Sequence, residues 1–470
     1  MRFLSAPSPS AAVYGCVMVI AAGFAVLLAR VPVQVSDCIN NIGTALTTSW
    51  SDFTLGGRGY LRPLIDPQTK LVLAVAPDRE FVAFRGVQVL QVFAAFWLFT
   101  RALRVQRWPQ AIGALVATTV FAGSHVFATL VREGYPINTY LTVALCALVA
   151  LNIATEARSR WWTDALVVGA FVLALGTIEN GLLVWVIVVA AAIAGYRGVS
   201  RPGIAILTVL VAVYMGTRFF VLDVGTPDLS ERSTGFGFAR LEPQQLEERF
   251  GANPLPLYAY NVMSAASTVL LGEPRNGIFV FLQAAAEREL RPWMIVELVS
   301  GVTVTALMVW YAWASAWKRA VAEWTPGQRR LFVAAAVLAA NAVISYAYAK
   351  DQVMSVAAIC VAWAAAAPIA ALVESPPRRR AAAVLSAAVL ALAASSWSIR
   401  VAGQQHLLVH TAFVTRNDWA TVDPTEAAQR FGGDPAVVAL IDSLRTRALA
   451  QEAVYPHVWS SRFAEDWFAH

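Results

Sequence analysis

Residues 163–196 read TDALVVGAFVLALGTIENGLLVWVIVVAAAIAGY, two apolar runs with only Glu179 and Asn180 between them. Each run is somewhat shorter than the ~20 residues that a helix needs to cross the hydrocarbon core of a bilayer. The pattern therefore predicts a tight hairpin of two helices, over 163–178 and 181–196, that need not cross a membrane fully. A carboxylate at the turn is costly unless it faces a cavity or a cation, so Glu179 is a candidate site residue.

Composition supports a membrane location for the whole chain. Of its 470 residues, 58% are hydrophobic and 14% are charged, whereas soluble domains carry about 25% charged residues. We predict an all-α polytopic membrane protein with about eleven transmembrane helices. The apolar runs cover 11–30, 82–103, 109–131, 136–155, 163–178, 181–196, 203–223, 293–317, 331–349, 352–373 and 381–399. The net charge of +6 then reflects topology rather than nucleic-acid binding.

Basic residues fall on every second connection between these runs. If the N-terminus is cytoplasmic, these are the cytoplasmic connections, as the positive-inside rule requires. They carry Arg104 and Arg107; Arg158 and Arg160; Arg197 and Arg201; Lys318, Arg319, Arg329 and Arg330; and Arg378, Arg379 and Arg380. The short connections on the other side carry Arg132 with Glu133, Glu179 alone, and Lys350 with Asp351. We expect an integral plasma (inner) membrane protein whose cytoplasmic side offers short basic connectors and no candidate pocket.

One apolar stretch is ambiguous. Residues 254–271 could form a further span, but a single crossing there would turn every later basic connection outward. We therefore predict one long outer loop over 224–292. Within it, 254–271 and 278–290 are expected to be amphipathic helices on the membrane surface.

The chain divides into two parts. Residues 1–399 are predicted to form the transmembrane domain, which includes a long first outer loop at 32–81. The tail, 400–470, has a soluble composition and is expected to be a small extracytoplasmic helical segment, with short helices near 424–431 and 435–453.

The chain ends and the cysteines add two expectations. The first apolar run is long and lacks a small-residue cleavage site, so it is interpreted as an uncleaved first span rather than a signal peptide. Cys16, Cys146 and Cys360 lie in apolar runs and only Cys38 lies in a loop, so no disulfide framework is predicted.

The first outer loop is a polar stretch between two spans, and Ser36–Leu64 reads SDCINNIGTALTTSWSDFTLGGRGYLRPL. Asp37 follows the first span and could act as a general base for a hydroxyl, although an isolated aspartate is more often a cap or turn residue. Asp52 could equally be an N-cap. Arg58 and Arg62 could hold a phosphate or diphosphate by bidentate hydrogen bonds, or simply keep the loop hydrated.

A second basic candidate lies at the end of a later span. Lys350 follows Tyr346 and Tyr348 closely. Its ammonium could meet a lipid-linked phosphate at the headgroup level, or it could snorkel to water without a ligand. Both interpretations stay open.

Several catalytic signatures are absent from the sequence. There is no P-loop, HExxH or GxSxG motif. The five histidines are dispersed, with His406 and His410 in the tail, and give no credible zinc site. Nucleotide-driven chemistry on the cytoplasmic side is therefore not expected.

The first outer loop resembles that of the type C (GT-C) glycosyltransferases, membrane enzymes that use polyprenyl-phosphate sugars. A similar pattern occurs in protein O-mannosyltransferase relatives that carry tetratricopeptide repeats, whose loop has paired aspartates, an Asn, Asp-Phe and Tyr-Arg-Pro-Leu. The matching positions here are Asp37, Asn41, Asp52-Phe53 and Arg62-Pro63-Leu64, with Tyr60 one place displaced. Cys38 stands at the second acidic position and no such repeats follow, so that family's metal binding and substrate choice do not transfer directly.

The resemblance implies a type C fold and an inverting transfer of a sugar from a polyprenyl-phosphate donor to an extracytoplasmic hydroxyl of a glycan, lipid or protein. It implies Asp37 as the catalytic base and Arg62 and Lys350 as contacts of the donor phosphate. Tyr346 is similar to the late tyrosine of that family.

Glu179 and Asp52 are expected to orient this site or to hold a divalent cation, Mg²⁺ or Mn²⁺, which prefers oxygen ligands. Two other functions stay open. One is a transporter or flippase of a lipid-linked or amphiphilic substrate, which would need charged groups in mid-span and broken helices in two repeated halves. The other is a catalytically inactive relative that binds a partner through its tail.

Overall fold

The computed structural model describes residues 8–29, 31, 38–50, 61–76, 79–132, 139–223, 229, 234–237, 239–271, 279–315, 317, 320–347, 349–374, 380–410 and 422–459. Over these ranges the chain is all-α apart from one antiparallel hairpin, β1 (Thr234–Phe236) with β2 (Ala239–Leu241). The α-helices are α1 (Pro9–Leu28), α2 (Cys38–Thr47), α3 (Ile65–Val75), α4 (Glu80–Leu103), α5 (Trp108–Gly123), α6 (His125–Arg132), α7 (Thr139–Ala154), α8 (Trp161–Thr177), α9 (Leu182–Ile193), α10 (Arg201–Gly216), α11 (Pro243–Phe250), α12 (Leu255–Leu271), α13 (Phe279–Glu287), α14 (Pro292–Ala314), α15 (Pro326–Ile344), α16 (Ser355–Glu374), α17 (Arg380–His410), α19 (Pro424–Gln429) and α20 (Pro435–Trp459). Short 3₁₀ helices are η1 (Glu179–Gly181), η4 (Val321–Glu323) and η5 (Asp351–Met354), and η2 (Thr217–Val221) is π-helical.

Seven of the described helices are long and apolar enough to cross a membrane. They cover Pro9–Leu28, Phe81–Leu103, Arg201–Val221, Pro292–Ala314, Pro326–Ile344, Asp351–Glu374 and Arg380–His406. Shorter apolar helices cover Thr139–Ala154, Trp161–Thr177, Glu179–Ile193 and Leu255–Leu271. An all-α protein compatible with a membrane is thus confirmed. The predicted tight hairpin is also confirmed, as α8, η1 and α9.

One predicted span is interrupted. The run 109–131 is two helices, because α5 ends at Gly123 and α6 begins at His125. Ser124 between them has an extended backbone, and its hydroxyl accepts a hydrogen bond from the amide of Phe127 at 3.1 Å. This is the geometry of a serine N-cap, which starts a new helix without changing the hydropathy of the segment.

The central helix of the bundle is α16. It packs against α5, α15 and α7, and 78% of its apolar window is buried. A Cβ at Gly113 of α5 would come within 2.6 Å of the carbonyl oxygen of Ala366, so the two backbones are very close. Small residues permit this approach, and close packing is a main source of helix association in lipid. Near the middle of α16, Trp363 Nε1 donates to the carbonyl of Ala102 at 2.9 Å, which ties α16 to the end of α4.

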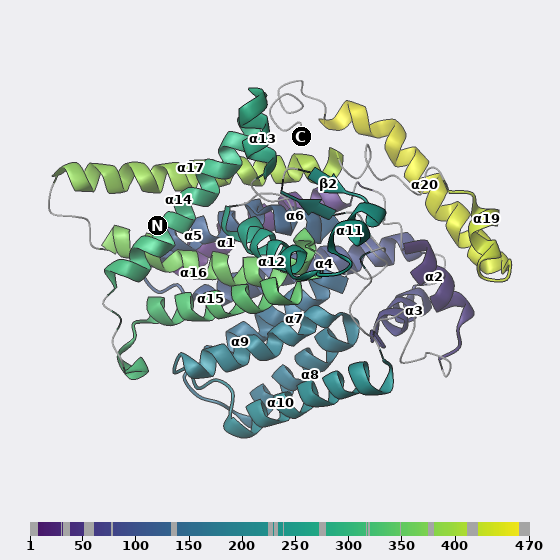
Figure 1. Ribbon diagram of the computed structural model, residues 1–470, viewed down its shortest axis with the longest axis horizontal. Helices are drawn as coiled ribbons and strands as arrows, with labels where there is room; N and C mark the ends of the chain where they lie inside the picture. Colours follow the sequence, from purple (N-terminus) through teal and green to yellow (C-terminus); the bar gives the residue numbers. More distant parts are fainter. Residues whose placement is uncertain are drawn as a thin grey trace, which may run out of the picture.

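Antiparallel neighbours gather the helix termini at two opposite ends of the bundle (Figure 1). We call the first of these the basic end. It contains the C-terminal ends of α4, α7, α9, α14 and α16 and the N-terminal ends of α5, α8, α10 and α15. Arg330 donates there to the carbonyl of Leu103 at 2.9 Å. At the second, the mixed end, η1 and η5 meet, where the side-chain amide of Asn180 donates to the carbonyl of Val353 at 2.5 Å. The alternation of basic and mixed connections in the sequence corresponds to these two ends.

The C-terminal helices pack against the first loop. α19 and α20, yellow in Figure 1, share an apolar cluster with α2, α3 and the start of α4. Phe431 lies so close to α2 that a Cβ at Gly43 would come within 2.3 Å of its ring. α17 continues to His410, so the predicted domain boundary at residue 399 falls inside a helix. The residues just after that boundary include Arg400 and Gln404, which are polar yet buried in the bundle.

Candidate functional site

A carboxylate between two guanidinium groups lies at the mixed end. Glu179 Oε2 accepts hydrogen bonds from Arg62 Nη2 at 2.9 Å and from Arg62 Nε at 3.2 Å. On the other side, Arg218 Nη1 lies 3.7 Å from Glu179 Oε1. The side chains of Glu179 and Arg218 are only 14% and 15% exposed, and that of Arg62 is 31% exposed. Three segments far apart in sequence therefore converge on one largely buried ionic cluster, which we call the Glu179 cluster.

The end of the first loop is fixed onto the hairpin, and this positions Arg62. The amide of Leu64 donates to the carbonyl of Gly176 at 2.9 Å, and Gln68 Nε2 donates to Thr177 Oγ1 at 2.9 Å. A Cβ at Gly176 would come within 2.7 Å of the Leu64 side chain. The loop thus lies directly on the last turn of α8, one residue before the turn that carries Glu179.

The turn itself depends on a close backbone approach. η1 reverses the chain in three residues, and a Cβ at Gly181 would come within 2.2 Å of the amide nitrogen of Leu175. No side chain fits there without moving the backbone. Glycine therefore allows the tight hairpin, and the hairpin holds Glu179 at the tip of two apolar helices.

Arg218 comes from a π-helical turn that the sequence analysis did not single out. α10 passes into the π-helix η2 at Thr217, and Arg218 is its second residue. Such turns insert an extra residue into a helix and are frequent at functional sites. Arg218 Nε is buried and makes no hydrogen bond within the described part of the chain. The available signal was a lone arginine near the end of the apolar run 203–223, where a charge is costly.

The neighbouring turn at the mixed end contains the other predicted basic candidate. Lys350 is the N-cap residue of η5, and Asp351 Oδ2 lies 3.7 Å from His125 Nδ1. η5 is joined to η1 because Asn180 and Asn341 both donate to the carbonyl of Val353. Lys350 and Glu179 therefore lie on two turns that are in direct contact.

Tyr346 has a different neighbour. Its ring packs edge-to-face against Tyr258 of α12 with the centroids 5.0 Å apart, and its carbonyl accepts a hydrogen bond from Asn261 at 3.0 Å. These contacts fasten α12 onto the mixed end. The ring of Tyr346 thus contributes to packing between segments in the arrangement described.

Four predicted residues, Asp37, Asp52, Arg58 and Tyr348, lie outside the described residues. The described chain resumes at Cys38, where α2 begins.

A divalent cation does not fit the described part of this site. Both carboxylate oxygens of Glu179 face guanidinium groups, which would repel a second cation. Among the described residues, no group of three or more His, Cys, Asp or Glu side chains could hold a metal ion. In this geometry Glu179 is a partner for arginines. The cation expected at Glu179 and Asp52 stays a prediction, because Asp52 lies outside the described residues.

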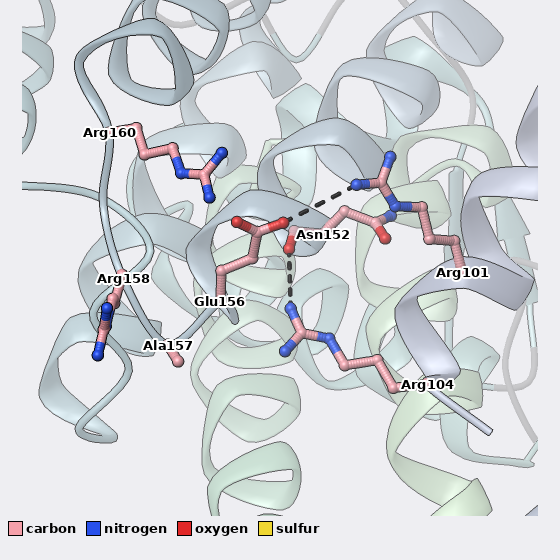
Figure 2. A pocket seen from close by; sticks show the side chains of 7 residues that line it. All are labelled: Arg101, Arg104, Asn152, Glu156, Ala157, Arg158 and Arg160. Carbon is pink, nitrogen blue, oxygen red and sulfur yellow. Dashed lines mark hydrogen bonds and ion pairs between the residues drawn. The ribbon is translucent and has the colours of Figure 1, made fainter. Parts of the chain in front are cut away.

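The prediction that the basic end has no candidate pocket is wrong. A cavity of about 390 Å³ lies at this end (Figure 2). It is lined by Arg101, Arg104, Asn152, Glu156, Arg158 and Arg160. From the sequence, these arginines were interpreted as topology signals only. Hydropathy and charge do not reveal that the ends of α4 and α7 and the start of α8 meet around an open space.

The Glu179 cluster holds two guanidinium groups against one carboxylate. Guanidinium groups donate in a fixed fork that matches phosphate, and Arg218 retains a buried, unused donor. No family model, no curated protein and no solved structure matches this chain. The geometry of the described residues is therefore the basis for the functional argument.

Proposed function

We propose that this protein is an integral membrane glycosyltransferase of the type C class. In this proposal about eleven helices cross the plasma membrane, and the mixed end faces away from the cytoplasm because the basic end stays inside. The substrate is a polyprenyl-phosphate sugar, and the acceptor is a hydroxyl of a glycan, lipid or protein.

The observation that carries the proposal is the Glu179 cluster with its second arginine. Arg62 and Arg218 approach one carboxylate from two sides at the tip of apolar helices, and Arg218 has an unused donor. A phosphate arriving there would meet two guanidinium groups that Glu179 already holds in place. Such prepositioned donors stabilise the charge that develops on a leaving phosphate.

A lipid-linked donor is supported by the surroundings of Arg218. The next three residues, Phe219, Phe220 and Val221, are apolar and exposed, with Phe220 89% exposed. An exposed apolar surface beside a buried cationic group suits a ligand with a phosphate head and a hydrocarbon tail. The polyprenyl chain would lie along this surface in the bilayer.

The reaction is a single displacement at the anomeric carbon. Asp37 accepts the proton of the acceptor hydroxyl, the hydroxyl oxygen forms a bond to that carbon, and the bond from the carbon to the phosphate oxygen breaks. The polyprenyl phosphate leaves with the electron pair, and Arg62, Arg218 and Lys350 stabilise its charge. Inversion at the sugar carbon follows from one displacement.

The test is transfer of labelled sugar in proteoliposomes supplied with the polyprenyl-phosphate donor. Asp37→Asn is expected to lower the rate about 10²–10⁴-fold because it removes the base. Asp223→Asn is the matched control. Asp223 is exposed and has a φ of +51°, a conformation that asparagine adopts as readily as aspartate. Full transfer by Asp37→Asn would overturn the assignment.

A second variant tests the phosphate contacts. Arg218→Gln is expected to lower transfer at saturating donor about 10²-fold or more, as loss of one oxyanion donor does in other enzymes. Arg201→Gln, at the opposite end of the same α10, is the control and should retain wild-type activity. Equal rates for both variants would exclude a role of Arg218 in stabilising the leaving group.

Transport of a lipid-linked substrate is the second candidate, and a buried ion pair between apolar helices favours it. Arg400 of α17 is fully buried, and its Nη2 lies 3.7 Å from Glu297 Oε1 of α14. Charged groups between membrane helices often mark transport pathways. Movement of a fluorescent polyprenyl-phosphate sugar between leaflets without product formation, abolished by Arg400→Met, would favour transport over transfer.

A further inference from the structure

The cavity at the basic end is an open hollow between three helix ends. The ends of α4 and α7 form two sides, and the segment that leads into α8 forms the third. Its volume of about 390 Å³ lies within the ~300–1,000 Å³ that is usual for small-ligand sites. Figure 2 shows Arg101, Arg104 and Arg160 extending toward Glu156 from different sides.

Positive charge is in excess in this cavity. Four arginines line it with one carboxylate, Glu156, and the nearest guanidinium to it, that of Arg101, lies 3.8 Å away. Arg104 is instead held by the carbonyl of Asn152 and by Thr155 Oγ1, each at 3.2 Å. Arg158 and Arg160 form no ion pair with any described residue. The cavity therefore carries an uncompensated positive charge.

A helix terminus adds to this excess. Arg160 is also the N-cap residue of α8, so the positive end of that helix dipole borders the cavity. Helix N-termini favour phosphate and similar anions.

The cavity lies at the level of an aromatic belt. Trp161 and Trp162 follow Arg160 directly and are exposed, as is Trp97 one turn before Arg101. Exposed tryptophans of membrane helices gather at the lipid headgroups. A ligand in the cavity would therefore be at the depth of the phosphates of the surrounding lipids.

We propose that this cavity is a phosphate-binding site, separate from the Glu179 cluster and at the opposite end of the bundle. The ligand is a phosphate group, carried either by an anionic lipid headgroup or by a soluble phosphate. Arg101, Arg104 and Arg160 donate to the phosphate oxygens, and Arg158 at the rim adds long-range attraction. Topology alone requires basic residues on a connection, but it does not require them to surround a cavity.

The test uses full-length protein in nanodiscs with two separate probes. In phosphatidylcholine alone, inorganic phosphate is titrated and binding is followed calorimetrically. In phosphatidylcholine with phosphatidylglycerol, retained phosphatidylglycerol is counted by native mass spectrometry. Binding of phosphatidylglycerol alone assigns the site to lipid headgroups, and binding of inorganic phosphate assigns it to soluble ligands as well. Absence of binding in both arms overturns the proposal.

Paired variants separate the cavity from the general charge of this end. Arg158→Gln with Arg160→Gln should weaken binding about twentyfold or more, because each arginine near a membrane surface contributes about fivefold. The control, Arg201→Gln with Arg380→Gln, removes the same charge from exposed arginines at the basic end that do not line the cavity. Equal weakening in both double variants would contradict a specific site.

A third variant is expected to strengthen binding rather than weaken it. Glu156→Gln removes the one acidic lining residue and should strengthen phosphate or phosphatidylglycerol binding about fivefold. A purely structural role of the arginines predicts no gain, since their partner would simply be lost. Unchanged or weaker binding by Glu156→Gln would contradict the proposal.

Discussion

The two ends of the bundle are formed by the same helices, but the ion pairs at one end are exposed and those at the other are buried. At the basic end the ion pairs are exposed: Arg107 and Glu374 meet at 2.9 Å with 66% and 32% of their side chains exposed. At the mixed end they are buried, as in the Glu179 cluster and in the pair of Arg400 with Glu297. Exposed pairs contribute little to stability, whereas a buried charge that loses its partner is very costly. Ion pairs at the mixed end are therefore expected to contribute more to stability and geometry than those at the basic end.

Tryptophan side chains also differ in exposure between the two ends. Among the described residues, every exposed tryptophan except Trp50 lies at the basic end. They are Trp97, Trp108, Trp161, Trp162, Trp310, Trp313 and Trp317. Trp397 and Trp293, by contrast, are buried near Arg400 and Glu297. The ring of Trp397 lies 4.4 Å from the Arg400 guanidinium, and its Nε1 donates to the carbonyl of Ser300.

The largest expected effect on stability is at the buried pair. Glu297→Leu removes the carboxylate beside the buried Arg400 guanidinium and leaves this cation with neutral acceptors such as the Gly123 carbonyl and the Ser300 hydroxyl. The free energy of unfolding should fall by about 3–5 kcal/mol. Unfolding by SDS titration in mixed micelles measures it.

The double variant Glu297→Leu with Arg400→Met is the control for this loss. Removing both charges should restore most of the stability, because no unpaired charge remains buried. The Gly123 carbonyl and Ser300 hydroxyl that now accept from Arg400 would then lose a donor, so recovery should be incomplete. Additive losses in the double variant would show that the pair is not coupled.

The second effect concerns the hairpin turn. Gly181→Ala should lower the free energy of unfolding by about 1–3 kcal/mol, because the added Cβ overlaps the backbone of Leu175. It should also lower transfer activity, since it displaces the neighbouring Glu179. Gly169→Ala, in α8 where a Cβ meets nothing within 4 Å, should leave both unchanged. Wild-type behaviour of Gly181→Ala would contradict the described turn.

The features that the sequence predicts are those in which local pattern and tertiary structure agree. The hairpin around Glu179 was predicted because two apolar runs leave only one place for the turn. The break at Ser124 was not predicted because the mean hydropathy of the run 109–131 is insensitive to a single capping residue. Arg62 and Glu179 were each singled out, but their pairing across 117 residues has no local signature.

Most of the other features that the sequence does not predict involve contacts between distant segments. Arg218 was missed because its direction is set by a π-helical turn. The pair of Glu297 with Arg400 was missed because Glu297 is a single charge in the run 293–317 and Arg400 directly follows the run 381–399. Packing of α20 on α2 joins the two ends of the chain through apolar residues that are common in any helix. Periodicity alone does not specify such partners.

The smallest expected effect is at the basic end. Arg107→Gln breaks the exposed pair with Glu374 and should change the free energy of unfolding by no more than about 1 kcal/mol. The same SDS titration gives the value, and added salt should reduce the difference further. A loss comparable to that of Glu297→Leu would remove the distinction between the two ends.

The most direct test of the account asks whether the two ends lie on opposite sides of the membrane. In a variant without native cysteines, Ala252→Cys reports the mixed end and Ser159→Cys the basic end, both at exposed positions. In right-side-out vesicles, a membrane-impermeant maleimide should label Ala252→Cys at once and Ser159→Cys only after permeabilisation. Labelling of both from outside, or of Ser159→Cys alone, would contradict the account.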